Sequence, residues 1–181
     1  MRKLEEAGFR LEKTKEAVFE SLVRDYVKKV LRLVYLIVKD RSLAEDITQE
    51  VFLKAYKNLS SFRGESSMQT WVYKIAMNEA RKHLRSWSFR HLFYRPDVDL
   101  EVAEAAESSV IHNDGRARFV RMVMNLPPNH RQMIVLHYYE ELSIEKMADI
   151  LGISPGAVYT RLHRARQKLK ERLEKEGLEW I

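Results

Sequence analysis

The sequence predicts an all-α protein of two small helical domains joined by a flexible linker. Apolar residues recur three or four positions apart along most of the chain, and no stretch has the alternating pattern of a strand. Only 6 glycines and 4 prolines interrupt 181 residues, which favours long helices with few turns. Between the two helical parts, residues 96–109 carry only acidic charges, and such a change in composition marks a domain boundary.

These patterns divide the chain into five parts. We expect a frayed or loosely helical N-terminal extension (1–15), a first domain (16–90), an acidic linker (91–114), a second domain (115–175) and a C-terminal tail (176–181).

Composition narrows the class of protein. Hydrophobic residues make up 45% of the chain and charged residues 32%, which supplies a core and a heavily charged surface. The net charge of +6 suits a polyanionic partner. The chain has no cysteine, which excludes disulfides and thiolate metal sites and fits a reducing compartment. Neither a signal peptide nor an apolar run of about 18 residues is present, so we expect a cytoplasmic protein without membrane insertion.

The first domain begins with two predicted helices. Apolar residues at helical spacing predict one helix over 16–39, with a stripe that must be buried. The capping-box pattern Ser42–Glu45 predicts the start of a second helix, which runs to about Leu59. One face of this helix is formed by Asp46, Gln49, Glu50 and Leu53. The spacing of these residues fits an ordinary solvated face and also a docking surface for a basic helix.

A serine-rich loop over residues 60–69 leads to a third helix. Thr70 is the expected N-cap, and the helix runs to about Ser86. One face of this helix is formed by Lys74, Asn78, Arg81 and Arg85, with Trp71 beside its start. Basic, amide and aromatic groups together suit a nucleic-acid backbone and unstacked bases. A core tryptophan next to a solvated basic face explains the same pattern.

The second domain is predicted to contain four short helices and to end in a helix-turn-helix. Helices are expected over 115–125 and 130–140, followed by the pair within 142–173. Ser143 and Ser154 are the expected N-caps of that pair, and Gly152 is where a left-handed residue ends the first helix. The second helix of such a unit enters the DNA major groove. A basic amphipathic helix hairpin with a solvated face is the alternative.

No pattern in the sequence indicates a catalytic centre. The six histidines form no HExxH pair, and His130 and His137 lack an evident third ligand. No glycine-rich phosphate loop follows a strand. We therefore expect a protein that is not an enzyme and has no catalytic residues, no metal site and no cofactor.

Two blocks of sequence resemble a known family. Leu43–Gly64, followed by Thr70–Arg85, resembles regions 2.2 to 2.4 of bacterial sigma factors, and Leu126–Leu169 resembles region 4. The short two-domain layout resembles the extracytoplasmic-function (ECF, group IV) subfamily of the sigma-70 family. The resemblance implies a sigma factor that binds core RNA polymerase and directs promoter recognition, DNA melting and transcription initiation. Its implied partners are core polymerase, promoter DNA and an anti-sigma factor.

The resemblance also assigns roles to the residues that match its motifs. The face Asp46, Gln49, Glu50 and Leu53 is implied to dock on the clamp coiled coil of the largest polymerase subunit. Binding of the single-stranded −10 element is implied for Arg63, Ser66, Ser67, Trp71, Lys74, Asn78, Arg81 and Arg85. Binding of the −35 element is implied for Ser154, Gly156, Tyr159, Thr160, Arg161, His163 and Arg164.

The chain departs from the family pattern at several positions, among them Ala157, which stands where a threonine is common. Tyr159 stands where a cation is common, Met68 where an aromatic is common, and Lys82 where an aspartate is common. Tyr159 is where we expect this protein's own promoter specificity to differ. Two other functions fit the helical patterns: a stand-alone helix-turn-helix regulator, whose first domain serves for dimerisation or effector binding, and a helical protein–protein adaptor.

Overall fold

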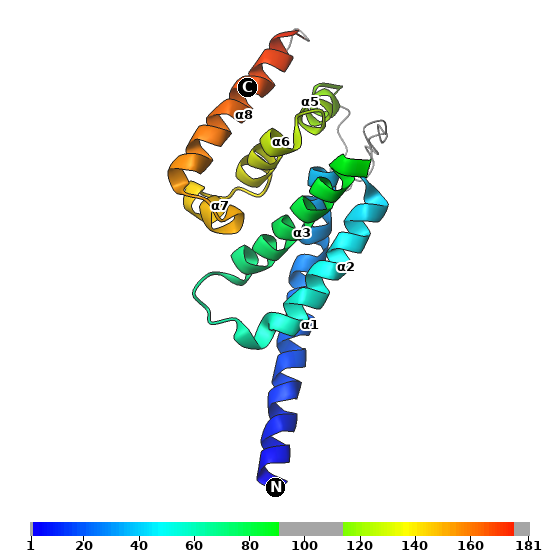
Figure 1. The fold of residues 1–181 in the computed structure, drawn as a ribbon, viewed down its shortest axis with the longest axis vertical. Coiled ribbons are helices and arrows are strands. Elements are labelled where there is room, and N and C mark those ends of the chain that lie inside the picture. Colours follow the sequence, from blue (N-terminus) through cyan, green and yellow to red (C-terminus); the bar gives the residue numbers. More distant parts are fainter. Residues whose placement is uncertain (1, 91–113, 176–181) are drawn as a thin grey trace.

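The computed structural model of the protein describes the backbone of residues 2–90 and 114–175, and the side chains of residues 15–85 and 119–175 within them. Every regular element in these ranges is helical (Figure 1). The first group comprises α1 (Arg2–Val38), α2 (Arg41–Asn58), a 3-10 turn (Leu59–Ser61) and α3 (Met68–Arg90). The second comprises α5 (Asp114–Met124), α6 (Pro128–Ile134), a π-helical turn (Val135–Tyr139), α7 (Ile144–Leu151) and α8 (Pro155–Lys175). Asp114 opens α5, whereas the rest of the predicted flexible linker and the predicted C-terminal tail lie outside the described residues.

The first three helices form a bundle in which α1 is much the longest. The helix predicted to begin at residue 16 begins at Arg2, so α1 continues through the predicted N-terminal extension as one helix. Its first turns project away from the rest of the molecule (Figure 1). Its second half packs against α2 and α3.

Two of the predicted caps are wrong. The side chain of Asp40, not Ser42, caps α2 by accepting a hydrogen bond from the Leu43 amide at 2.9 Å. Lys39 has φ of +65°, which ends α1 and leaves Asp40 extended at the start of the next helix. The N-cap of α3 is Ser67 and not Thr70. The Ser67 hydroxyl accepts a hydrogen bond from the Thr70 amide at 3.1 Å. The helix that follows continues to Arg90, beyond the expected end near Ser86.

The helix-turn-helix forms as its sequence predicts. The hydroxyl of Ser143 accepts a hydrogen bond from the Lys146 amide, and Gly152 adopts φ of +64°. The hydroxyl of Ser154 accepts a hydrogen bond from the Ala157 amide at 3.2 Å, just before Pro155 opens α8. Along α8 the predicted buried stripe is solvent-inaccessible at Val158, Leu162, Ala165 and Leu169. The preceding predicted helix over 130–140 differs, because its second half is the π-helical turn.

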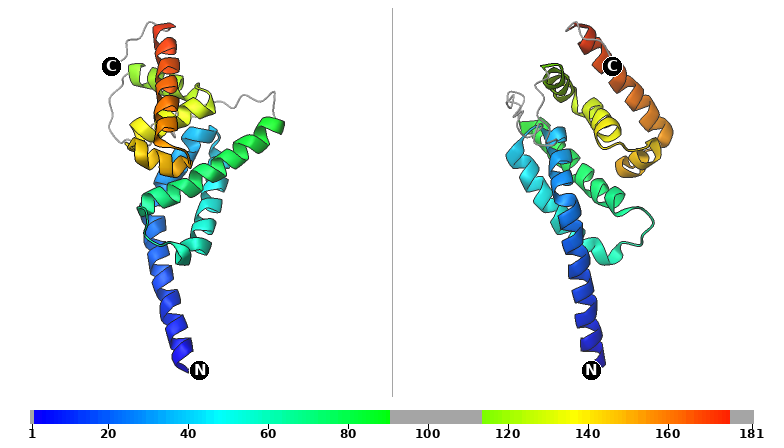
Figure 2. Two further views of the ribbon diagram at one scale, coloured as in Figure 1. Left: turned by 60° about the vertical axis from the view of Figure 1, so that its left-hand side comes forward. Right: turned by 180° about the vertical axis from the view of Figure 1, so that it is seen from behind.

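The two groups of helices share one hydrophobic core. At the end of α1, residues 33–38 form a continuous apolar run in which no side chain is more than 8% exposed. A helix that packs on one side only leaves part of each turn in water, so a second surface must cover this run. The second group supplies it, because α6 packs on α1 and α7 packs on α3 (Figure 2).

Polar groups also join the two halves of the molecule. The guanidinium of Arg131, only 3% exposed, donates hydrogen bonds to the carbonyls of Met124, Leu126 and Ile37, the last at 2.6 Å. Burial lowers the pKa of Arg131 to about 10. The side chain still carries its proton at neutral pH, so its charge is balanced by three carbonyl dipoles, one of which belongs to α1.

Candidate nucleic-acid interface

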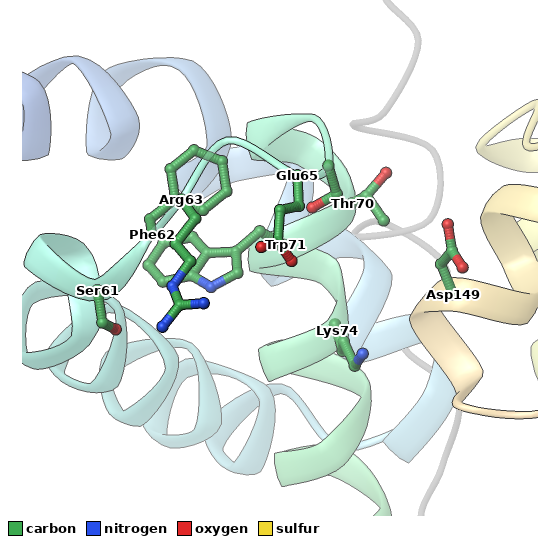
Figure 3. Close-up of a pocket in the computed structure, with 9 residues that line it drawn as sticks. Ser61, Phe62, Arg63, Glu65, Thr70, Trp71, Lys74 and Asp149 are labelled. Carbon is green, nitrogen blue, oxygen red and sulfur yellow. The ribbon is translucent and has the colours of Figure 1, made fainter.

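The loop between α2 and α3 forms one wall of a pocket of about 470 Å³ (Figure 3). The pocket is lined by Ser61, Phe62, Arg63, Glu65, Ser66, Thr70, Trp71, Lys74 and Asp149. The indole of Trp71 is half-buried, and its centroid lies 5.2 Å from that of Phe62. A tilted aromatic pair beside an exposed arginine and lysine combines a surface for stacking with positive charge, which are the two features that bind single-stranded nucleic acid.

The predicted basic face of α3 continues from this pocket. Lys74, Asn78 and Arg85 are exposed, as a nucleic-acid-binding surface requires. Arg81 is half-buried, and its guanidinium donates a hydrogen bond to the carbonyl oxygen of Leu151, the last residue of α7, at 3.2 Å. Burial, followed by the nearby charges of Arg161 and Arg85, holds the pKa of Arg81 below its ordinary value. The structure therefore brings Arg81 of the first domain close to Arg161 of α8.

Three predicted site residues lie in the loop itself. Arg63 and Ser67 are exposed, and Ser66 is half-buried in the pocket wall. The Ser67 hydroxyl lies 2.9 Å from the hydroxyl of Thr70 and also caps α3. Ser67 therefore fixes where the loop meets the helix, a structural role beyond the one that the sequence predicts.

The predicted reading surface of α8 is fully accessible. All seven residues assigned to the −35 element are exposed, and Tyr159 is 65% exposed, the most exposed large hydrophobic residue among the described side chains. The Thr160 hydroxyl donates a hydrogen bond to the carbonyl of Gly156 at 3.0 Å, so this hydroxyl is held against the first turn of α8. The buried stripe on the opposite side fixes the helix on the domain and leaves this face to a ligand.

The predicted polymerase-docking face of α2 is also at the surface. Asp46 and Gln49 are exposed, and Leu53 is 61% exposed. Glu50 is half-buried, and one of its carboxylate oxygens lies 3.4 Å from Nε2 of His83 on α3. An exposed leucine beside carboxylates, with Tyr56 also exposed on α2, suits a partner helix that carries both apolar and basic side chains.

Behind this face, a buried carboxylate ties α2 to α3. Glu79 is 6% exposed, accepts a hydrogen bond from the ammonium of Lys54 and lies 3.8 Å from that of Lys82. Burial alone raises the pKa of Glu79, but the hydrogen bond and the two lysine charges outweigh it, and the pKa lies below its ordinary value. Lys82 therefore belongs to an ion-pair network around Glu79, and the Lys54–Glu79 pair of that network joins α2 to α3.

Several residues at the junction of the domains were not predicted from the sequence. The phenol of Tyr73 donates a hydrogen bond to the carboxylate of Glu140 at 2.5 Å, and burial raises the pKa of both groups. Asp149 of α7 lines the pocket of the first domain opposite Lys74 (Figure 3). In the sequence, only the unbroken apolar run at 33–38 indicates that a second group of helices covers α1. The run does not indicate which residues of that group make the contacts.

Comparisons with known proteins identify both halves of the chain. The family model for sigma-70 region 2 matches residues 22–89, and that for sigma-70 region 4 matches residues 116–169. The RNA polymerase sigma-H factor of Pseudomonas aeruginosa is 31% identical over 175 residues, which cover 91% of each chain. The chain belongs to the sigma-70 family. It falls in the ECF group, because the ECF RNA polymerase sigma-E factor of Escherichia coli is also 31% identical, over 179 residues and 91% of each chain.

Solved structures share the fold of this sigma factor. CnrH, in complex with the cytosolic domain of CnrY, matches with a TM-score of 0.65 at 24% identity, over 88% of this chain and 90% of that one. RpoE of Bartonella quintana, in complex with the anti-sigma factor NepR, matches with a TM-score of 0.64 at 24% identity, over 86% and 96% of the two chains. These likenesses confirm the all-α architecture with region 2 and region 4 helices.

Membership of the family confirms the predicted function. The protein is a sigma factor, a transcription initiation factor that binds core RNA polymerase and directs it to promoter DNA. A stand-alone regulator is not favoured, because the relatives match across both domains. Within the described parts of the chain, no helix combines the length and apolar character needed to cross a bilayer.

Proposed function

We propose that the two domains, over residues 16–90 and 115–175, read the −10 and −35 elements of a promoter respectively, with residues 91–114 as the link between them. The observation that carries this proposal is the pocket beside Trp71, which lies directly next to the basic face of α3. A base that leaves the duplex needs a surface for stacking, and the neighbouring phosphates need cations. This part of the first domain offers both.

The energetics are consistent with this division of roles. Opening a base-pair step costs on the order of 1.4 kcal/mol. Stacking a freed base on an aromatic side chain returns about 1–3 kcal/mol. We assign the base-stacking role to Trp71, and we assign strand contacts to Arg63, Ser66, Ser67, Lys74, Asn78, Arg81 and Arg85. Duplex reading by α8 then fixes the position at which strand opening occurs, through its exposed residues 154–164.

The α2 face is proposed as the contact with the polymerase. Asp46, Gln49, Glu50 and Leu53 present two carboxylates, an amide and an exposed apolar side chain on one helix face. Such a face fits a basic amphipathic helix, here the clamp coiled coil of the largest subunit. Nucleotidyl transfer then belongs to the polymerase, and this chain acts without catalytic residues or a cofactor in the cytoplasm of a bacterium.

We also propose an anti-sigma factor as a regulatory partner. RpoE of Bartonella quintana, which has the same fold, was solved in complex with the anti-sigma factor NepR. An inhibitor that binds both domains would block the polymerase and the promoter together.

The experiment that tests the proposed function is transcription in vitro. Purified bacterial core polymerase is supplied with genomic fragments, with and without the full chain, and the transcripts are sequenced. We expect a small set of start sites that depend on the chain and share −10 and −35 sequences. If no transcript depends on the chain, although the polymerase is active with its own primary sigma factor, the proposed function is wrong.

A further inference from the structure

The start of α8 has one large side chain that can reach the edges of bases. In a helix-turn-helix, the N-terminal residues of the second helix contact base edges in the major groove. Among the first six residues of α8, 155–160, only Tyr159 has a large side chain. Val158 is buried, and the Thr160 hydroxyl donates its proton to the carbonyl of Gly156. The contacts that this part of α8 can make deep in a groove therefore depend on Tyr159.

Tyr159 differs from the other exposed tyrosines because its ring has no partner among the described side chains. Each of the other three has a cation between 4.4 and 5.4 Å from its ring centroid: Lys15 at Tyr56, Arg32 at Tyr139 and Arg166 at Tyr138. The side chain of a helical residue lies over the preceding turn. Three positions before Tyr159 that turn has Gly156, which has no side chain to cover the ring, and Tyr159 is 65% exposed.

The position of this ring gives its exposure a meaning. A single exposed apolar residue is common on protein surfaces and by itself indicates nothing. Tyr159, however, stands on the exposed face of α8 between the glycine at 156 and the exposed His163. The buried stripe of α8 fixes the helix on its domain, so this face and its ring are presented together to a ligand.

The chemistry of tyrosine narrows what the ring can recognise. A phenol hydroxyl both donates and accepts hydrogen bonds, so it fits the edge of every base and selects none. The ring is apolar, and in the major groove the C5-methyl group of thymine is the apolar group that distinguishes one base from another. The groups that identify the other bases there are hydrogen-bond donors and acceptors. An aromatic ring at this position therefore fits thymine better than any other base.

We propose that the ring of Tyr159 packs against the C5-methyl group of a thymine in the −35 element, and so selects an A·T pair at that position. This proposal rests on the proposed function of α8 and names the base that one of its residues reads. Removing the methyl group from the DNA should weaken binding about fourfold, as for one methyl group that is no longer buried.

The preference is measured with holoenzyme, formed from bacterial core polymerase and the full chain. The template is a promoter that depends on the chain, with its −35 region randomised, and the transcribed templates are sequenced. Tyr159→Phe keeps the ring and removes the hydroxyl, whereas Tyr159→Ser removes the ring. Tyr138→Ser is the matched control, because it makes the same change at an exposed tyrosine of the same domain that lies outside α8.

We expect the wild type, Tyr159→Phe and Tyr138→Ser to select thymine at one position of the −35 element. Tyr159→Ser should lose the preference at that position and keep the preferences at the others. An unchanged thymine preference in Tyr159→Ser overturns the proposal. A loss in Tyr159→Phe as complete as in Tyr159→Ser also overturns it, since the hydroxyl would then be the group that reads the base.

The methyl group itself is tested by replacing that thymine with uracil, which differs from it only by lacking the methyl. Binding of holoenzyme to a fluorescein-labelled promoter duplex is measured by anisotropy. Uracil should weaken binding about fourfold for the wild type and Tyr159→Phe, and less than about twofold for Tyr159→Ser. Where cytosine replaces the thymine, 5-methylcytosine should restore part of the lost affinity, again only with the ring present. Equal binding of thymine and uracil duplexes by the wild type overturns the proposal.

Failure of the proposed function gives a different result. In that case the holoenzyme of the wild type selects no −35 sequence from the randomised templates. If only the inference about Tyr159 is wrong, a −35 sequence is selected and is the same for the wild type and Tyr159→Ser.

Discussion

Gly152 provides a sharp test of how the turn of the helix-turn-helix is stabilised. It adopts φ of +64° at the end of α7, a backbone conformation that residues with a Cβ rarely adopt. A Cβ built at this position meets no atom within 4 Å, so the substitution Gly152→Ala introduces backbone strain and no steric clash. The left-handed conformation costs an alanine on the order of 1 kcal/mol. We expect the free energy of unfolding to fall by about that amount.

Gly156 is a matched control in the same motif. It lies in the first turns of α8, has no positive φ, and its added Cβ also meets nothing within 4 Å. Because alanine is favoured over glycine inside a helix by roughly 0.5–1 kcal/mol, Gly156→Ala should stabilise the protein. The two substitutions add the same methyl group to open space, four residues apart, and should change stability with opposite signs.

The measurement is urea unfolding of the full chain, followed by circular dichroism, with thermal unfolding alongside. A loss of about 1 kcal/mol lowers the Tm by about 2–4 °C if all 181 residues unfold together, and by about 4–8 °C if the second domain unfolds alone. The size of the shift therefore also reports whether the shared core couples the domains. Equal destabilisation by both substitutions would refute the reasoning, since steric crowding would then be the common cause.

Further predictions concern the two interfaces and the buried carboxylate. Asp46→Arg should abolish capture of core polymerase, measured by pull-down, and leave binding of a −35 duplex unchanged. Arg164→Ala should weaken that duplex binding and reduce the salt slope by about 1 in an anisotropy titration, as for one lost phosphate contact; an unchanged affinity at moderate salt would count against the assignment. Glu79 has a lowered pKa, so its stabilising effect is present above pH 4.5 and is lost as the pH falls towards the pKa of the folded state. As the pH falls below 4.5, the free energy of unfolding should therefore decrease more steeply in the wild type than in the Glu79→Gln variant.

The sequence predicts best what depends on neighbouring residues. Ser143, Gly152 and Ser154 act within a few positions of themselves, and the turn that they form is found as expected. The start of α2 shows the limit of such local reasoning. Asp40 and Ser42 are both good capping residues, and the left-handed Lys39 decides between them. That conformation depends on how α1 ends, which no local pattern records.

The junction between the domains could not be predicted in this way. Tyr73 and Glu140 are 67 positions apart, and Arg131 lies 94 positions from Ile37. Each of these polar residues has an ordinary explanation within its own helix, and only the fold pairs them. The apolar run at 33–38 predicts burial on every side, because no face of that helix turn is polar. It does not say which element covers it. The separate domains were therefore expected, and their packing against each other was not.

The packing of the second domain against the first has an electrostatic cost. Both surfaces that we propose to read the promoter carry arginines, so the packing of the domains brings Arg81 near Arg161 and Arg85, and after burial their mutual repulsion contributes to the lowered pKa of Arg81. The junction offsets this with apolar burial and with acceptors that are carbonyls or carboxylates, as at Leu151 and Glu140. Salt screens the repulsion between the arginines and also weakens DNA binding. Added salt should therefore ease the packing of the two domains against each other and weaken the binding of DNA to both surfaces.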